Sequence, residues 1–200
     1  MDNCADEEPV NSRVNYRSMR FGSLIIKSAI LVLVLNTSSG AGADAPPSEY
    51  RIKAAFIYHF SQFVDWPQNT FAAPDSPFII GVLGENPFGA DLEQTIHGKS
   101  MGTHPLVVRF LGSSDEAATQ CKMLFISSSM QKQFPRIMAG LAASGTLTVG
   151  ESDKFNESGG MIQFVMEGTK IRFRINEDAA QQAGLKISAK LLSLAIHAQK

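Results

Sequence analysis

Short apolar runs alternate with helix-like segments along most of the chain, and this alternation constrains its fold more than any other feature. Residues 77–84 (PFIIGVLG) form a continuous apolar run rich in β-branched side chains. Such a run is typical of a strand that is buried on both faces. Comparable runs cover residues 105–111, 121–126 and 145–150. The pattern predicts a three-layer α/β fold, in which a largely parallel sheet is flanked by helices.

The C-terminal part of the chain departs from this repeat. Residues 161–166 and 170–175 predict two strands, and the short turn at residues 167–169 joins them into a β-hairpin. Asn176 follows as a candidate N-cap of a short helix. Apolar residues spaced over 187–198 predict a terminal helix.

The segment 50–67 (YRIKAAFIYHFSQFVDWP) predicts an amphipathic helix that precedes the first strand. Its apolar side chains recur at spacings of three and four residues, which defines one buried face. Ser48 is placed to cap the helix, and Pro67 disfavours the helical conformation at Trp66. We therefore expect the helix to end at Trp66, the only tryptophan of the chain. The apolar face consists of Ile52, Phe56, Phe60 and Phe63, widened by Ile57 and Val64.

Residues 1–43 contain the three parts of a secretory signal peptide. Arginines precede a short apolar run over residues 24–35, and an Ala-x-Ala arrangement ends at Ala43. The run is shorter than the roughly 20 apolar residues that cross a bilayer, so an uncleaved anchor is the weaker alternative. We expect cleavage after Ala43, with Ala45 as the other site, and one domain over residues 44–200. Met19 is an alternative start, because a complete signal follows it.

The charge balance argues against one broad class of partner. The chain has 18 Lys and Arg against 19 Asp and Glu, a net charge of −1. There is no basic excess to hold a phosphate backbone, so we expect no nucleic acid partner. A hydrophobic content of 44% with 18% charged residues is typical of a folded globular domain.

Recognised catalytic and metal-binding motifs are absent from the sequence. The four histidines lack the H-x-x-x-H spacing of a zinc site, and no G-x-S-x-G nucleophile motif occurs. We therefore expect no enzymatic activity, no metal and no cofactor. Cys121 would be the only cysteine after cleavage, and it begins an apolar run, which favours a buried and unreactive thiol.

Two strand-to-helix turns are candidates for a ligand loop. Gly84 and Asn86 follow the first apolar run, and Ser127 and Ser128 follow the third. Open α/β sheets bind ligands at the carboxyl ends of their parallel strands. The same residue types are ordinary turn and capping residues, so a ligand loop and a plain turn both stay open.

Three segments of the chain resemble one known family. They are residues 54–67 (AAFIYHFSQFVDWP), residues 78–93 (FIIGVLGENPFGADLE) and residues 155–195, which begin FNESGGMIQF. The sequence is similar to the YfiR-type periplasmic regulators, also catalogued as a domain of unknown function, over nearly all of residues 50–198. The resemblance implies a compact α/β domain in the periplasm of a Gram-negative bacterium.

The resemblance also implies a function. Characterised members of that family bind the periplasmic sensor domain of a membrane-bound diguanylate cyclase and repress it, which lowers cyclic di-GMP and biofilm formation. A non-catalytic regulator of this kind is expected here, and a homodimer stays open. The best-studied members respond to redox conditions through disulfides. Cys121 alone cannot form an internal disulfide, so only intermolecular pairing stays open.

We expect the partner to contact an aromatic surface at the end of the first helix, because aromatic side chains dominate interface energetics. The competing hypothesis is a periplasmic small-molecule-binding sensor subunit that acts with another membrane receptor or kinase, with its ligand at the two turns described above. The residues expected at the partner surface are Phe63, Trp66, Pro67, Phe71 and Phe88.

Overall fold

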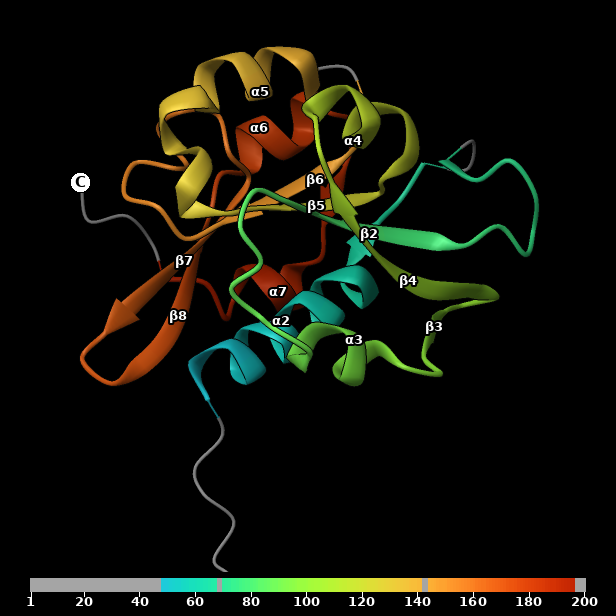
Figure 1. Cartoon of the computed structure of the whole chain (residues 1–200), viewed down its shortest axis with the longest axis horizontal. Coiled ribbons are helices and arrows are strands. Elements are labelled where there is room, and N and C mark those ends of the chain that lie inside the picture. Colours follow the sequence, from blue (N-terminus) through green and yellow to red (C-terminus); the bar gives the residue numbers. More distant parts are fainter. Residues whose placement is uncertain (1–47, 68–69, 142–143, 197–200) are drawn as a thin grey trace, which may run out of the picture. The chain divides into compact units, whose positions relative to one another are not determined.

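The computed structural model describes residues 48–67, 70–141 and 144–196, and the signal peptide predicted for residues 1–43 lies outside them. Within the described part, seven strands form one sheet in the order β3-β4-β2-β5-β6-β7-β8 (Figure 1). The strands are β2 (Phe78–Leu83), β3 (Ser100–Met101), β4 (His104–Leu111), β5 (Met123–Ile126), β6 (Leu147–Gly150), β7 (Ile162–Glu167) and β8 (Lys170–Ile175).

Most neighbouring strands of this sheet run parallel. β4, β2, β5, β6 and β7 form four successive parallel pairs. The two outermost strands, β3 and β8, pair antiparallel with their neighbours. Helical segments connect β2 to β4, β4 to β5 and β5 to β6, whereas the connection from β6 to β7 over residues 151–161 contains no helix. The predicted α/β class, the largely parallel sheet and the C-terminal hairpin are confirmed. The connecting segments are α3 (Asp91–Ile96), α4 (Ser114–Gln120), η3 (Ser128–Gln133) and α5 (Phe134–Leu141).

Alternation along the strands divides the core between the two faces of the sheet. Ile80 and Phe125 belong to the cluster that packs under α2 and α3, whereas Leu83 and Leu124 belong to the cluster under α4 and α5. Figure 1 shows these helix pairs on opposite sides of the sheet. Side chains of a strand point alternately to its two faces, so a strand covered on both sides is apolar throughout.

The first helix, α2 (Glu49–Gln62), begins where the sequence predicts and ends earlier than predicted. Ser48 caps it, because its hydroxyl accepts from the amide of Arg51 at 3.1 Å. The helix was expected to reach Trp66, and this boundary is wrong. The next residues form β1 (Val64–Asp65), which pairs antiparallel with β9 (Lys186–Ile187) in a separate two-stranded sheet. Pairing with a distant strand overrides the local helical pattern.

The same pairing shortens the predicted terminal helix. Ile187 belongs to β9, and α7 (Ala189–Leu192) starts after Ser188, whose hydroxyl accepts from the amide of Leu191. The predicted helix over 187–198 therefore begins later, and residues 197–200 lie outside the described part. The short helix after the hairpin, α6 (Glu177–Gln182), is capped by Asn176 as expected.

The aromatic face of α2 gives a direct test of this packing. Phe60 is 0% exposed, whereas Phe110 on β4 is 53% exposed. We expect Phe60→Ala to lower the free energy of unfolding by about 3–5 kcal/mol, because it leaves a cavity against the sheet. Phe110→Ala, the matched control, should change it by less than about 0.5 kcal/mol. Urea unfolding measures both values, and equal values for the two variants would contradict the described packing.

Candidate functional site

Trp66 follows β1 and is anchored on one side only. Its indole Nε1 donates to the carbonyl oxygen of Ser61 at 3.4 Å. Its ring meets the buried ring of Phe78 edge to face, with centroids 5.0 Å apart. Trp66 is nevertheless half-buried, so part of the indole stays accessible at the surface.

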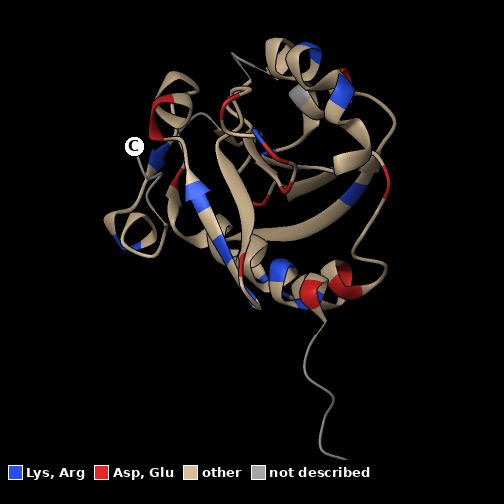
Figure 2. Ribbon diagram, turned by 90° about the vertical axis from the view of Figure 1, so that its left-hand side faces the viewer, with Lys and Arg blue, Asp and Glu red and all other residues tan. Residues whose placement is uncertain are grey.

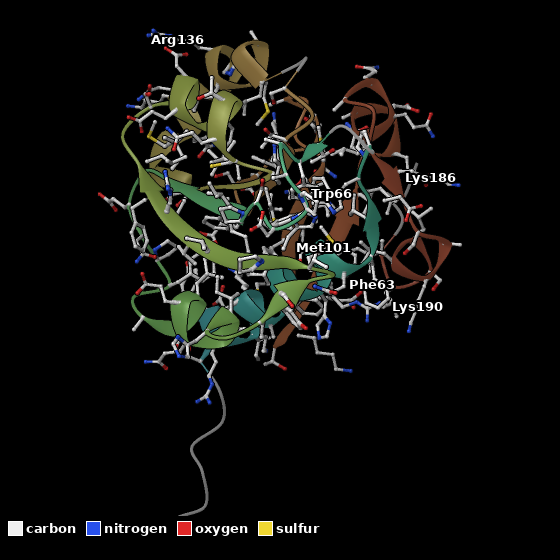
Figure 3. The ribbon with its side chains drawn as sticks, turned by 90° about the vertical axis from the view of Figure 1, so that its right-hand side faces the viewer. Phe63, Trp66, Met101, Arg136, Lys186 and Lys190 are labelled. Atoms are coloured by element: carbon white, nitrogen blue, oxygen red, sulfur yellow. The ribbon has the colours of Figure 1, made fainter. Side chains whose placement is uncertain are left out.

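A groove of about 630 Å³ opens beside Trp66, between the end of α2 and the turn that joins β3 to β4. Phe71 stacks on the imidazole of His104 with ring centroids 3.6 Å apart, and His104 Nδ1 lies 2.7 Å from the carbonyl oxygen of Ser76. Figure 3 shows Trp66 and Met101 on the same side of the molecule. We call this feature the Trp66 groove. Its lining includes Gln62, Asp65, Trp66, Pro67, Phe71, Met101 and His104.

The structure brings three of the five predicted contact residues together. Trp66, Pro67 and Phe71 line the Trp66 groove. Phe63 lies beside it, and the Nζ of Lys190 sits 4.9 Å from the centroid of its ring. The fifth residue, Phe88, is only 3% exposed and packs edge to face on a core phenylalanine. Phe88 therefore does not belong to the contact surface.

The two predicted ligand turns do meet at the carboxyl ends of β2 and β5. The Ser129 hydroxyl accepts from the amide of Glu85 at 3.0 Å and donates to the Ser127 hydroxyl at 3.2 Å. Gly84 has φ +92°, and a Cβ there would lie 2.6 Å from Ser129 Oγ. These contacts fix the two turns against each other, and they engage one of the four candidate groups, the Ser127 hydroxyl, as an acceptor.

Asn86 and Ser128, the other two predicted ligand residues, are placed apart from this contact. Asn86 closes its own turn, because its Oδ1 accepts from the amide of Phe88 and its Nδ2 donates to the carbonyl of Gly89. Ser128 lines a different and more strongly charged cavity. The hydrogen bonds of Asn86 are those of an ordinary turn residue, and they require no ligand.

That cavity is lined in part by an ion pair that the sequence analysis missed. Lys53 of α2 is 4% exposed, and its Nζ donates to Glu49 and to Glu151, each at 2.5 Å. Glu151 follows β6, and it also accepts from the hydroxyl of Tyr50 at 3.2 Å. We call Glu49, Tyr50, Lys53 and Glu151 the charged cluster. The sequence did indicate a buried charge at Lys53, because this residue lies four positions before Ile57 and therefore on the buried face of α2.

The charged cluster shifts two pKa values. Burial disfavours the ammonium of Lys53, but the hydrogen bonds and charges of Glu151 and Glu49 outweigh that effect and raise its pKa. Burial raises the pKa of Tyr50, and the carboxylate of Glu151 adds to the shift. Lys53 thus stays cationic and Tyr50 stays a neutral hydrogen-bond donor near neutral pH.

A cavity of about 610 Å³ borders the charged cluster. The start of α2, the loop after β6 and the β7–β8 hairpin supply its walls. Both signs of charge occur there, and in the part of the chain that the structure describes no three His, Cys, Asp or Glu side chains are arranged to hold a metal ion. We call this the hairpin cavity. Its charged lining residues are Glu49, Lys53, Glu151, Asp153, Lys154 and Arg174.

Cys121 is buried where the chain enters β5. It is 3% exposed, and a Cβ on the neighbouring Gly81 would lie 2.7 Å from its Sγ. Burial raises the pKa of the thiol to about 11. A thiol that is both enclosed and protonated is poorly suited to an intermolecular disulfide.

The chain belongs to the YfiR/HmsC-like family, whose model matches residues 50–196. That match includes the whole lining of the Trp66 groove and every lining residue of the hairpin cavity except Glu49. Membership supports a general role as a periplasmic regulator, and the family is generally non-enzymatic. No curated protein matches the chain in sequence.

Solved structures that are similar to the chain include the following two. One is the crystal structure of a conserved domain protein from Vibrio cholerae O1 biovar El Tor, with a TM-score of 0.52 and 13% identity over 76% of this chain. This chain spans 60% of that structure's length, and the likeness concerns the fold alone. The other is an ABC domain in complex with L-Trp from Streptococcus pneumoniae, with a TM-score of 0.44 and 15% identity, covering 59% of this chain and 54% of the other.

Across residues 48–67, 70–141 and 144–196, no helix combines the length and the apolar character that a membrane span requires.

The state of Cys121 predicts slow alkylation. A thiol with a pKa of about 11 is almost wholly protonated at pH 8. We expect iodoacetamide to modify native Cys121 at least a hundredfold more slowly than the urea-unfolded chain, by the order-of-magnitude difference in thiolate content. A Cys4→Ser background restricts the readout to Cys121, and mass spectrometry follows the reaction. Equal rates, or a disulfide-linked dimer of the native protein, would contradict this description.

Proposed function

We propose that this protein binds the periplasmic sensor domain of a membrane-bound diguanylate cyclase and represses that enzyme. Repression lowers cyclic di-GMP, and with it biofilm formation. Membership of the YfiR/HmsC-like family over residues 50–196 supports the regulatory class. The cyclase partner follows from the resemblance to characterised regulators of this type.

The Trp66 groove is the observation that carries the proposal of a docking surface. Trp66, Phe71 and Met101 are each partly exposed there. Aromatic residues and methionine are enriched at protein interfaces, and tryptophan is among the commonest hot-spot residues. Because Phe78 holds one edge of the indole, the exposed part is presented in a fixed orientation. A fixed anchor loses little conformational entropy when a partner binds.

The charges beside the groove favour an acidic rim on the partner. Lys190 lies over Phe63, and Lys186 is the β9 partner of Asp65. Figure 3 shows Phe63, Lys186 and Lys190 close to Trp66 on one side of the molecule. Exposed charges at an interface rim raise the association rate more than the affinity. An apolar anchor with acidic neighbours is therefore the partner surface that this face fits.

Repression by docking requires a difference in affinity between two states of the sensor domain. The regulator shifts the cyclase only as far as it binds the inactive conformation more tightly than the active one. A change from mostly active to mostly inactive requires a preference of about 10⁴-fold. No catalytic step is needed on the regulator.

A small-molecule-binding sensor subunit is the second candidate function. The hairpin cavity favours it, because its volume of about 610 Å³ lies in the range of small-ligand sites and its charged side chains could bind a polar ligand. The two candidate functions are compatible, since the Trp66 groove and the hairpin cavity share none of their lining residues.

Substitutions in the Trp66 groove test the docking proposal. We expect Trp66→Ala to weaken binding to the purified periplasmic domain of the cyclase by at least about tenfold, or 1.4 kcal/mol. Trp66 also packs on Phe78, so Met101→Glu, at a partly exposed position of the same groove, provides a second variant, because its carboxylate would repel an acidic rim. Lys132→Ala, at an exposed position of η3, is the control and should bind as the wild type does.

Isothermal titration calorimetry measures the three affinities, and thermal unfolding confirms that each variant is folded. If both groove variants bind within about threefold of the control, the proposed docking surface is wrong.

A further inference from the structure

The strand β7 continues past the end of β6. β6 ends at Gly150, opposite Gln163, whereas β7 runs on to Glu167 and is paired with β8 along its whole length. On the side that faces β6, residues 164–167 therefore have no strand partner within the described part of the chain. Such an edge presents backbone N–H and C=O groups to which another extended backbone can pair.

The hairpin cavity lies against this unpaired edge. Phe164, Val165 and Met166 are among its lining residues, and Met166 is 51% exposed. Four residues of a strand span roughly 13 Å at about 3.3 Å each, which matches a tripeptide or tetrapeptide in extended form. The cavity volume of about 610 Å³ lies in the usual range for small-ligand sites.

Charged groups of both signs converge on the same cavity. Lys53 holds Glu49 and Glu151 in place on one wall. Lys154 and Arg174 have exposed side chains and, among the described residues, no acidic partner within salt-bridge distance. Figure 2 faces the hairpin and shows basic residues spaced along one of its strands. The lining therefore offers carboxylates to an ammonium and a guanidinium to a carboxylate.

The mixture of acidic and basic side chains disfavours two classes of ligand, those with only one sign of charge and those that are apolar. Three acidic and three basic side chains line it, so a ligand with a single type of charge meets like charges as well. An apolar ligand would remove water from these charges without replacing their hydrogen bonds, which is costly. The buried ion pair of Lys53 and Glu151 is expected to add little to the stability of the fold, because the cost of removing both charges from water offsets most of their attraction. A role in recognition accounts for its position on the cavity wall.

We propose that the hairpin cavity binds short peptides with free termini, which extend along the unpaired edge of β7. Backbone hydrogen bonds to residues 164–167 hold the peptide in extended form. Its ammonium meets the carboxylates of the charged cluster, and its carboxylate meets Arg174. Apolar side chains of the peptide rest on Val165 and Met166. The proposal does not depend on repression of a cyclase, because binding is measured on this protein alone.

The test uses an equimolar mixture of free tripeptides, with trialanine among them, at millimolar total concentration. The purified protein is incubated with the mixture, and retained peptides are identified by mass spectrometry after rapid gel filtration. Their affinities are then measured by calorimetry. Arg174→Gln removes the unpartnered guanidinium, and Arg136→Gln is the matched control at an exposed position of α5. Figure 3 shows Arg136 far from the labelled residues of the Trp66 groove.

We expect the wild type and Arg136→Gln to retain the same tripeptides. Arg174→Gln should bind them at least about tenfold more weakly, a loss of 1.4 kcal/mol. The same peptides with acetylated and amidated ends should also bind at least about tenfold more weakly. Retention of no tripeptide by the wild type would overturn the proposal, and so would equal affinities for the Arg174 and Arg136 variants. Both substitutions lie at exposed positions, so thermal unfolding should show unchanged folding.

Discussion

The aromatic packing of α2 on the β7–β8 hairpin is the interaction on which the rest of this structure depends. Phe60 lies with its ring centroid 5.1 Å from that of Phe173 and 5.7 Å from that of Phe164. This contact fixes a helix from the start of the domain against strands near its end. Each candidate site is lined by one end of this helix. Its first turns line the hairpin cavity, and its last turn borders the Trp66 groove.

The ion pair of Lys53 with Glu151 adds a second link between α2 and the sheet. It joins residues 98 positions apart in the sequence, and it places Glu151 where β6 ends. Because β7 and β8 continue beyond that point, the pair stands beside an open stretch of strand edge. The hairpin cavity therefore lies where β6 ends, and Lys53 positions two of the carboxylates that line it.

Local patterns in the sequence predict the strands and most of the caps, because burial on both faces requires apolar runs and free amides require acceptors. Long-range pairing explains the failures. Val64 and Ile187 were predicted to be helical, but they pair with each other in the β1–β9 sheet. No local sequence pattern near either residue indicates the other as its partner. Phe88 looks like an exposed loop aromatic, but the turn closed by Asn86 directs it into the core. Lys53 could have been singled out as a charge on a buried stripe, whereas its partner Glu151 could not.

The function proposed above is that the domain acts by docking on a membrane-bound diguanylate cyclase. The most direct measurement adds the purified protein to spheroplasts that contain the cyclase and lack the regulator, so that the sensor domain is accessible from outside. Cyclic di-GMP inside the spheroplasts is then quantified. The account predicts a fall of at least about fivefold at saturating protein, in line with typical coupling between sites. An unchanged level at a protein concentration that saturates binding to the sensor domain would contradict it.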